Sequence, residues 1–367
     1  MDRQHPILSQ RKESMLKKTG AVLFVALIVV LGLWRESPAK EPAKETYRIA
    51  WSHYTGWEPW EYIRQSGILD KWAAKYGIAI QLDLINDYIE SINLYTGGNY
   101  HGCAMTNMDA LTIPALGGVD STALIVGDFS NGNDGIVIKK GSHVKDLKGR
   151  EVKLVELSVS HYLLARALEM NKIKETDLTI VNTSDADIAA IFASDKKGAV
   201  VTWNPPLLQC RNEKDAKMVF DSSMIPGEII DLLVVRSDSP DSLKKALTGA
   251  WYEAMQIMSG KAAGTDRAIA SMADFAGGSI DDFKAQLKTT AMFYEPGLAA
   301  DFAAGKKLKD TMEYVRTFSF AHGLYGDADS KDFVGIEFPD GSVMGGKDNV
   351  RLRFSAEYMK MAAEGKL

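Results

Sequence analysis

The chain is poor in cysteine, and this excludes a small protein held together by several disulfides as well as a zinc site built from cysteines. Its 367 residues contain two cysteines, Cys103 and Cys210. Two are too few for a disulfide framework, and their separation matches no zinc-binding spacing. A single bridge between them and a pair of free thiols are both compatible with the sequence.

An excess of positive charge is also missing from most of the chain. Residues 1–40 hold seven Lys/Arg and three Asp/Glu, a balance of +4, so the formal net charge of −5 leaves −9 for residues 41–367. Proteins that bind the phosphates of nucleic acids need a basic face. Nucleic acid is therefore not an expected partner.

The common catalytic and nucleotide-binding motifs are absent as well. The sequence has no G-x-S-x-G elbow, H-E-x-x-H, Walker loop or Rossmann glycine fingerprint. His101 and Cys103 form an isolated H-x-C without further ligands at metal spacing. We therefore predict no catalytic residues, no bound metal and no cofactor.

The N-terminus, by contrast, has the order of an export signal. Residues 11–18, "RKESMLKK", are basic on balance, and residues 21–34, "AVLFVALIVVLGLW", form an unbroken apolar run. That run suits a signal peptide, since a spanning helix needs roughly 20 residues. Met15 is an alternative start. Cleavage within "WRESPAKEPAKE" and retention as a membrane anchor are both open, so residues 1–45 are interpreted as a signal or anchor segment and linker.

The rest of the chain alternates between strand and helix patterns. A strand at 46–51, a helix at about 58–75 and further alternation up to "DGIVIKK" indicate βαβ units and a mostly parallel sheet. The pattern then restarts after "LKGREVKLVE". We predict an α/β protein with a first lobe at 46–135, a second lobe at 136–235 and a helical C-terminal section, 236–367, that returns to the first lobe. Two such lobes enclose a ligand cleft at the carboxyl ends of their strands, with a hinge between them.

One short stretch, "RIAWSHYTGWEPWEYI" at residues 48–63, is unusually aromatic and follows the first strand. Trp60 and Tyr62 lie within the predicted helix, so we expect them in the core. Trp57 is next to Gly56 in a loop and is expected to face the cleft. Trp51 ends the strand and suits either place.

The order of elements resembles a known family. The stretch "DGIVIKKGSHVKDLKGREVKLVELSVSHYLLARALEMNKIKETDLTIVNTSDADIAAIFASDKKGAVVTWNPPL" is similar to the type II periplasmic solute-binding proteins of ABC importers, in the nitrate, sulfonate and taurine-like group. "AWSHYTGWEPW", "TNMDAL" and "VTWNPPL" resemble, within that group, a branch encoded beside urea carboxylases and connected with urea and guanidine. The resemblance extends over about residues 46–330.

This resemblance implies a type II periplasmic-binding-protein fold whose two lobes close on a small solute. It also implies a periplasmic or other extracytoplasmic location and docking on an ABC permease in the inner membrane. We expect the protein to act as a monomer. The alternative is a ligand-sensing or enzyme-like use of the same fold, as in relatives that make a thiamine-precursor pyrimidine, although two distant cysteines do not supply their cysteine-rich motif.

The segments expected at the cleft are acidic. "SHYTGWEPW", "TNMDAL", "ELSVSHY", "WNPPL" and "EIIDLL" contain carboxylates but no lysine or arginine. Carboxylates accept paired hydrogen bonds from a guanidinium-like fork, and aromatic faces attract cations. The pattern favours guanidinium as the solute, then urea, a substituted guanidine or another small amine.

Ten residues are candidate ligand contacts. Asp109 and Asn107 are also candidates for a helix cap, and His161 for a neighbour of such a cap. Glu156 is selected because it ends a predicted apolar strand, and Asp231 because it interrupts one. The predicted ligand-binding residues are His53, Tyr54, Trp57, Asn107, Asp109, Glu156, Ser160, His161, Trp203 and Asp231.

Overall fold

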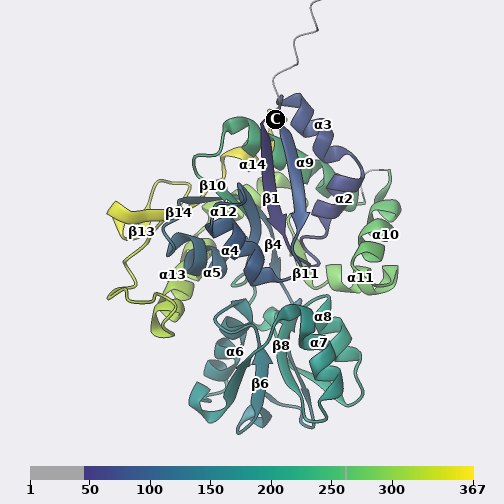
Figure 1. The fold of residues 1–367 in the computed structure, drawn as a ribbon, viewed down its shortest axis with the longest axis vertical. Coiled ribbons are helices and arrows are strands. Elements are labelled where there is room, and N and C mark those ends of the chain that lie inside the picture. Colours follow the sequence, from purple (N-terminus) through teal and green to yellow (C-terminus); the bar gives the residue numbers. More distant parts are fainter. Residues whose placement is uncertain (1–44, 261–262) are drawn as a thin grey trace, which may run out of the picture. The chain divides into compact units, whose positions relative to one another are not determined.

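The computed structural model describes residues 45–260 and 263–367, so the predicted signal or anchor segment and nearly all of its linker lie outside the described residues. Within the described ranges the chain forms two sheets, each flanked by helices (Figure 1). The predicted α/β fold with two lobes is confirmed.

The larger sheet defines the first lobe. Its central strands run in the order β14-β4-β10-β3-β1-β2, with β10 antiparallel to both β3 and β4. Its members are β1 (Thr46–Trp51), β2 (Ala79–Leu84), β3 (Gly102–Thr106), β4 (Ser121–Ser130), β10 (Ile230–Arg236), β11 (Thr290–Met292), β12 (Gly335–Glu337), β13 (Val343–Gly345) and β14 (Val350–Phe354).

The helices of the first lobe come from both ends of the described chain. They are α2 (Pro59–Gln65), α3 (Ile68–Lys75), α4 (Tyr88–Thr96), α5 (Asn107–Ala110), the π-helix η1 (Leu111–Ala115), α9 (Asp241–Met258), α10 (Thr265–Phe275), α11 (Ile280–Leu287), α12 (Pro296–Ala304), α13 (Lys306–Ala321), the 3₁₀ turn η5 (Lys347–Asn349) and α14 (Glu357–Ala363).

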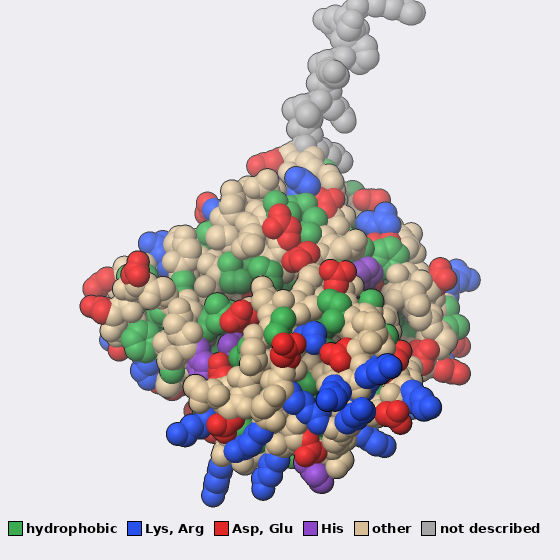
Figure 2. Space-filling view, turned by 60° about the horizontal axis from the view of Figure 1, so that its bottom comes forward, with side chains coloured by type: hydrophobic (Ala, Val, Ile, Leu, Met, Phe, Trp, Pro, Cys, Tyr) green, Lys and Arg blue, Asp and Glu red, His purple; other side chains and the backbone are tan. Residues whose placement is uncertain are grey.

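The second lobe is built on a five-stranded sheet of order β7-β6-β8-β5-β9. Its strands are β5 (Asp134–Lys139), β6 (Glu151–Leu154), β7 (Thr179–Asn182), β8 (Ala199–Trp203) and β9 (Ala216–Asp221). Its helices are α6 (Val159–Met170), α7 (Asp185–Ser194) and α8 (Pro206–Asn212), with 3₁₀ turns η2 (Val144–Leu147), η3 (Glu175–Asp177) and η4 (Ser222–Met224). Exposed lysines such as Lys145, Lys148 and Lys197 belong to this lobe, over which basic side chains gather in Figure 2.

The structure corrects three predictions: where the second lobe ends, what the C-terminal section consists of, and how many helices lie at 58–75. Strand β10 pairs with β3 and β4 of the first lobe, so the second lobe does not extend to residue 235. The C-terminal section is not helical throughout, because β11 to β14 join the larger sheet. The single helix predicted at 58–75 is two helices, since Gly67 between them adopts φ +76°, a left-handed conformation that ends α2 and begins α3.

The chain crosses between the lobes twice, from β4 to β5 and from β9 to β10. The two crossings are joined by hydroxyl groups: Ser130 Oγ and Ser222 Oγ lie 2.7 Å apart, and Ser222 Oγ also accepts from Gly132 N at 2.7 Å. These bonds satisfy buried polar groups where no sheet partner is available. The crossings are the natural place for the hinge predicted from the sequence.

The core of the first lobe contains most of the tryptophans of the aromatic stretch. Helix α9 buries residues at helical spacing, among them Leu243, Leu247 and Trp251, and it packs against α2 and α3. Trp60 packs on Trp251 with ring centroids 4.9 Å apart, which confirms its predicted core position. Trp51 is also buried.

Two further questions are whether the two cysteines are bridged and whether a described helix could span a membrane. Cys103 and Cys210 are both buried free thiols, so the unbridged alternative is confirmed. Among the helices in the described ranges, none combines the length and apolar character that a bilayer span requires.

Candidate functional site

A small closed cavity lies where the two lobes meet. The first lobe supplies Tyr54, Trp57, Tyr88, Thr106, Ile229 and Asp231, and the second lobe supplies Asp134, Val159 and Trp203. The cavity leaves about 10 Å³ for the centre of a water-sized sphere, which is room for about one water. A solute larger than water therefore enters only when the lining side chains or the two lobes move apart.

The polar groups of the cavity are dominated by carboxylates. Asp134 and Asp231 line it directly. Two more buried aspartates bond to lining residues: Asp128 Oδ1 accepts from Tyr54 OH at 3.1 Å, and Asp109 Oδ2 accepts from Tyr88 OH at 2.6 Å. Asp128 and Asp231 are directly opposite each other on the antiparallel strands β4 and β10.

Each of these four carboxylates keeps one buried oxygen without a hydrogen-bond partner among the described residues. The atoms are Asp109 Oδ1, Asp128 Oδ2, Asp134 Oδ2 and Asp231 Oδ2. Leaving a buried acceptor unpaired costs about 1–3 kcal/mol, and more when the group is charged. Asp134 and Asp231 line the cavity, so their free oxygens can receive hydrogen-bond donors from a solute. Asp128 and Asp231 also hydrogen-bond to each other, so one of this pair carries a proton when no solute is bound.

Burial and mutual repulsion change how these carboxyl groups titrate. Burial raises the pKa of Asp128 and of Asp134 to about 7 and that of Asp109 to about 6. The pKa of Asp231 lies well above its usual range, first through burial and then through repulsion from Asp128 and Asp134. Near neutral pH the cluster therefore retains protons that a cation can displace.

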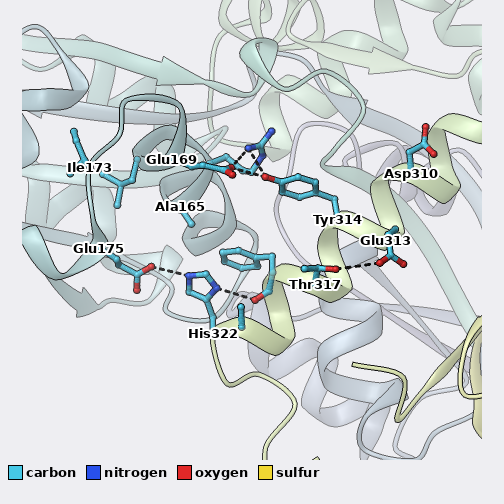
Figure 3. A pocket seen from close by; sticks show the side chains of 13 residues that line it. Ala165, Glu169, Ile173, Glu175, Asp310, Glu313, Tyr314, Thr317 and His322 are labelled. Carbon is cyan, nitrogen blue, oxygen red and sulfur yellow. Dashed lines mark hydrogen bonds and ion pairs between the residues drawn. The ribbon is translucent and has the colours of Figure 1, made fainter. Parts of the chain in front are cut away.

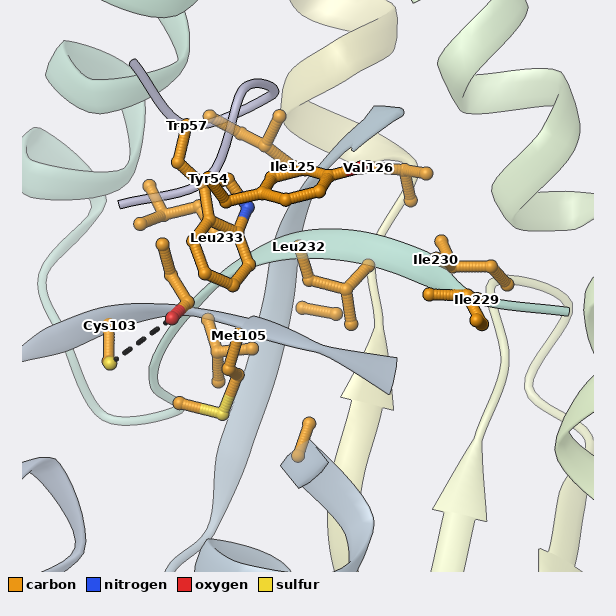
Figure 4. Packing of buried hydrophobic residues seen from close by; sticks show 14 of the residues in the cluster. Tyr54, Trp57, Cys103, Met105, Ile125, Val126, Ile229, Ile230, Leu232 and Leu233 are labelled. Carbon is orange, nitrogen blue, oxygen red and sulfur yellow. Dashed lines mark hydrogen bonds between the residues drawn. The ribbon is translucent and has the colours of Figure 1, made fainter. Parts of the chain in front are cut away.

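Aromatic rings form the other walls. Trp57 lies with its ring centroid 5.1 Å from that of Tyr54 and 5.5 Å from that of Tyr88, and Trp203 meets Tyr88 edge-on at 5.5 Å. Tyr54 and Trp57 lie over buried residues of β4 and β10, including Ile125 and Leu233 (Figure 4). Trp57 Nε1 has no partner among the described residues.

Trp203 also connects the lobes. Its Nε1 donates to His53 O of the first lobe at 3.3 Å. The same edge of the cavity carries a second contact, because Ser184 Oγ of the second lobe donates to Asp87 Oδ2 at 3.1 Å. The walls of the cavity are thus completed only when both lobes are in contact.

Basic side chains do not balance this cluster. Among the described residues the buried ones are Lys139 and Arg316. Lys139 donates to the carbonyl oxygens of Phe192 and Ala193, and Arg316 pairs with acidic side chains of its own surroundings. No cluster of three or more His, Cys, Asp or Glu in the described ranges is arranged to hold a metal ion.

The structure brings together part of the predicted site. Tyr54, Trp57, Trp203 and Asp231 line the cavity, and Asp109 bonds to lining residues. His53 lies at the edge, with Nδ1 2.7 Å from Glu58 Oε1. Ser160 is buried at the start of α6, and its Oγ has no partner among the described residues.

Besides His53, Asp109 and Ser160, three further predicted contacts do not line the cavity. Glu156 is exposed, because β6 ends at Leu154 and the chain then turns toward solvent. Asn107 holds the chain before β10, accepting from Ile230 N at 3.0 Å and donating to Glu228 O at 3.2 Å. His161 is bonded to Glu175 Oε1 at 3.0 Å, outside the residues that line the cavity.

Sequence reasoning missed Asp128, Asp134 and Tyr88. Asp128 interrupts the apolar strand "STALIVGDFS" as Asp231 interrupts "EIIDLLVV", so the argument applied to Asp231 would have found it. Asp134 opens a strand, where an aspartate is an ordinary turn residue. Tyr88 lies in a helix whose pattern gives no sign that its hydroxyl reaches Asp109.

Comparison with known proteins agrees with this architecture. Residues 125–239 match the family described as "NMT1/THI5 like". A 111-residue segment is 35% identical to the taurine-binding periplasmic protein of Escherichia coli K12, covering 29% of this chain and 34% of that protein. The chain thus matches about a third of the length of this relative.

Two solved structures share the fold at low identity. The alkanesulfonate-binding protein of Xanthomonas axonopodis pv. citri, bound to MOPS, superposes with a TM-score of 0.62 at 16% identity, over 78% of this chain and 96% of that one. The periplasmic aliphatic sulphonate binding protein of Escherichia coli gives 0.63 at 16% identity, over 78% and 95%. These relatives are named as binding proteins and not as enzymes. The protein therefore has the fold of the periplasmic binding proteins, with residues 125–239 matching the NMT1/THI5-like family.

Proposed function

We propose that the protein is an extracytoplasmic solute-binding protein of the ABC-importer type, and that its solute is a small planar cation, guanidinium before urea. The observation that carries the choice of solute is the group of four buried carboxylates at one small cavity: Asp134 and Asp231 line it, and Asp128 and Asp109 bond to its lining tyrosines. Guanidinium presents N–H donors in a plane, which suits paired hydrogen bonds to carboxylates. The aromatic walls add attraction for a cation.

Urea is the second candidate. Trp57 Nε1 is a buried donor without a partner among the described residues, and a carbonyl oxygen would accept from it. Urea is neutral, however, so it gains no charge pairing from Asp134 and Asp231. The number of carboxylates therefore favours the cation.

Sulfonates and nitrate suit the cavity less well. An anion there would face Asp134 and Asp231, and no described residue places a buried lysine or arginine beside it. The same argument applies to the sulfonate end of taurine, since an unpaired buried charge is costly. The sulfonate-binding relatives therefore support the fold in this proposal, whereas the residues that line the cavity support the choice of solute.

In this proposal the protein is exported by its N-terminal segment, binds its solute as a monomer and delivers it to a membrane permease. The alternative is an enzyme-like or sensing use of the same fold. Incubation of the purified protein with its solute distinguishes them, because a transport protein returns the solute chemically unchanged. A converted solute would favour the enzyme-like alternative.

Calorimetry and thermal unfolding of the full chain test the choice of solute. We expect guanidinium at non-denaturing concentrations to bind, and at a hundred times its dissociation constant to stabilise the fold by about 2.7 kcal/mol. Urea is expected to bind more weakly, and nitrate, sulfate and taurine not at all. Tight binding of taurine or nitrate, with none of guanidinium, would contradict the proposal.

The affinity for guanidinium is also expected to depend on pH. Because the pKa of Asp128 and of Asp134 is raised to about 7, cation binding must displace protons below that pH. Affinity should therefore rise between about pH 5 and pH 8. Urea, being neutral, serves as the control and should lack this rise.

The solute-free protein should show the opposite trend in stability. A carboxyl group whose pKa is higher in the folded state than in the unfolded state stabilises the fold most below the unfolded value, here 3.8. That contribution is lost as pH rises through about 7.

Guanidinium affinity that does not change between about pH 5 and pH 8 would show that the carboxylate cluster does not receive the cation.

A further inference from the structure

A second cluster of titratable groups joins the two lobes outside the solute cavity. Glu175 of η3, in the second lobe, accepts from two histidines, with Oε1 3.0 Å from His161 Nε2 and Oε2 3.1 Å from His322 Nε2. His161 belongs to α6 of the same lobe, whereas His322 follows the last turn of α13 in the first lobe. The bond between Glu175 and His322 therefore crosses from one lobe to the other (Figure 3).

The hydrogen bonds of His322 define its protonation state. Its Nδ1 lies 2.9 Å from Phe318 O and its Nε2 lies 3.1 Å from Glu175 Oε2. A carbonyl oxygen and a carboxylate both accept, so each ring nitrogen must carry a hydrogen. His322 is positively charged in this arrangement.

His161 is in the opposite state. Its Nδ1 accepts from Leu157 N at 3.2 Å, so that nitrogen carries no hydrogen. Its Nε2 then donates to Glu175 as a neutral imidazole. One carboxylate thus receives one neutral and one charged histidine, and of these two histidines His322 is the one that brings its charge from the other lobe.

Packing holds His322 in place. Its ring stacks on Phe318 with centroids 4.0 Å apart, and Phe318 meets Tyr162 of α6 edge-on at 5.0 Å. The ring of His161 lies 5.9 Å from that of His322. Deprotonated His322 cannot donate to Phe318 O and to Glu175 at once, so it must give up one of the two bonds.

We infer that Glu175 and His322 form a proton-operated latch between the lobes, with His161 orienting the carboxylate. Protonated His322 adds a charged bond between the lobes beside the bonds that Arg166 makes to Glu228 and Tyr314, and its deprotonation weakens this side of the interface. The latch shares no residue with the lining of the solute cavity, so it does not depend on which solute is bound. Acid is expected to favour the closed form and mildly alkaline pH the open form.

The surrounding charges do not provide another partner for His322. On α6, Arg166 pairs with Glu169 and with Glu228, and it also donates to Tyr314 OH of α13. On α13, Asp310 pairs with Lys306, and Glu313 pairs with Arg316 and Lys331. The hydrogen bond to Glu175 raises the pKa of His322, and bonds to both histidines hold the pKa of Glu175 well below its usual range.

The test measures the distance between the lobes in the full chain without added solute. Nitroxides at two exposed sites, introduced as Asp70→Cys in the first lobe and Lys196→Cys in the second, report this distance by electron–electron resonance. Cys103 and Cys210 are buried and should not be labelled. Between about pH 6 and pH 8.5 we expect the closed-to-open ratio to fall about threefold to fivefold, as for a partly exposed charge pair.

Two matched variants decide the assignment. His322→Gln keeps a donor but loses the charge, so the pH step should disappear. His161→Gln replaces a histidine that is already neutral, so the step should remain. A step that persists in His322→Gln, or no step in the unmodified chain, would overturn the latch, whereas failure of guanidinium to bind would overturn only the proposed solute.

Discussion

Asp134→Asn and Asp231→Asn are each expected to weaken guanidinium binding by about tenfold to a hundredfold. Both carboxylates line the cavity and keep a free oxygen for the solute. Removing one charge-assisted hydrogen bond in a desolvated site costs about 1.5–3 kcal/mol. Asparagine also presents an amide N–H group where the cation needs an acceptor. Calorimetry on the two variants measures the loss.

The same substitutions should not harm the fold. Near pH 8 the Asp134 carboxylate is ionised and buried beside other acidic groups, because its pKa is about 7. Replacing it by a neutral side chain of the same shape removes that penalty, so the solute-free Asp134→Asn variant should unfold at the same or a higher temperature than the unmodified chain. Weaker binding together with unchanged or greater stability is the signature of a site that is built for its solute at the expense of stability.

Glu156→Gln provides the matched control. It removes a carboxylate of the second lobe that the sequence pattern associated with the site but that lies exposed in the structure. We expect it to leave guanidinium affinity unchanged. If Glu156→Gln weakens binding as much as Asp134→Asn, the effect is a general one of net charge and the cavity is not the site.

Trp251→Ala is expected to cause the largest loss of stability, about 3–5 kcal/mol. Trp251 is 1% exposed and packs on Trp60 with centroids 4.9 Å apart. Its ring also reaches β4, where a Cβ added to Gly127 would lie 3.1 Å from Trp251 Cζ2. The substitution therefore opens a large cavity between α9 and the sheet.

Denaturant unfolding of the full chain, monitored in the solute-free state, measures this loss. Leu298→Ala is a suitable control, since Leu298 is 60% exposed and exposed positions usually change stability by no more than about 0.5 kcal/mol. A loss below about 1 kcal/mol for Trp251→Ala would mean that this tryptophan pair does not hold α9 on the sheet.

Local patterns in the sequence determined the class of fold and a part of the site. The alternation of strand and helix predicts two α/β lobes. Each element needs one buried face, and the spacing of apolar residues along the chain shows where that face lies. The position of Trp60 within a helical pattern predicts its place in the core. Asp231 stands out in the sequence because burying a carboxylate in an apolar strand is costly. These inferences needed only neighbours along the chain.

Tertiary structure decided which side chains meet. Asp128 and Asp231 are opposite each other because β10 returns from the second lobe to pair with β4, and β11 to β14 were missed because short strands acquire their identity from partners far away in sequence. Glu156 and His161 were misplaced for the same reason: one turns toward solvent just beyond the end of β6, and the other meets Glu175, which in turn meets His322, 147 residues further along the chain. The burial of a side chain and its hydrogen-bond partners depend on residues far away in the sequence, and the pattern of neighbouring residues does not contain that information.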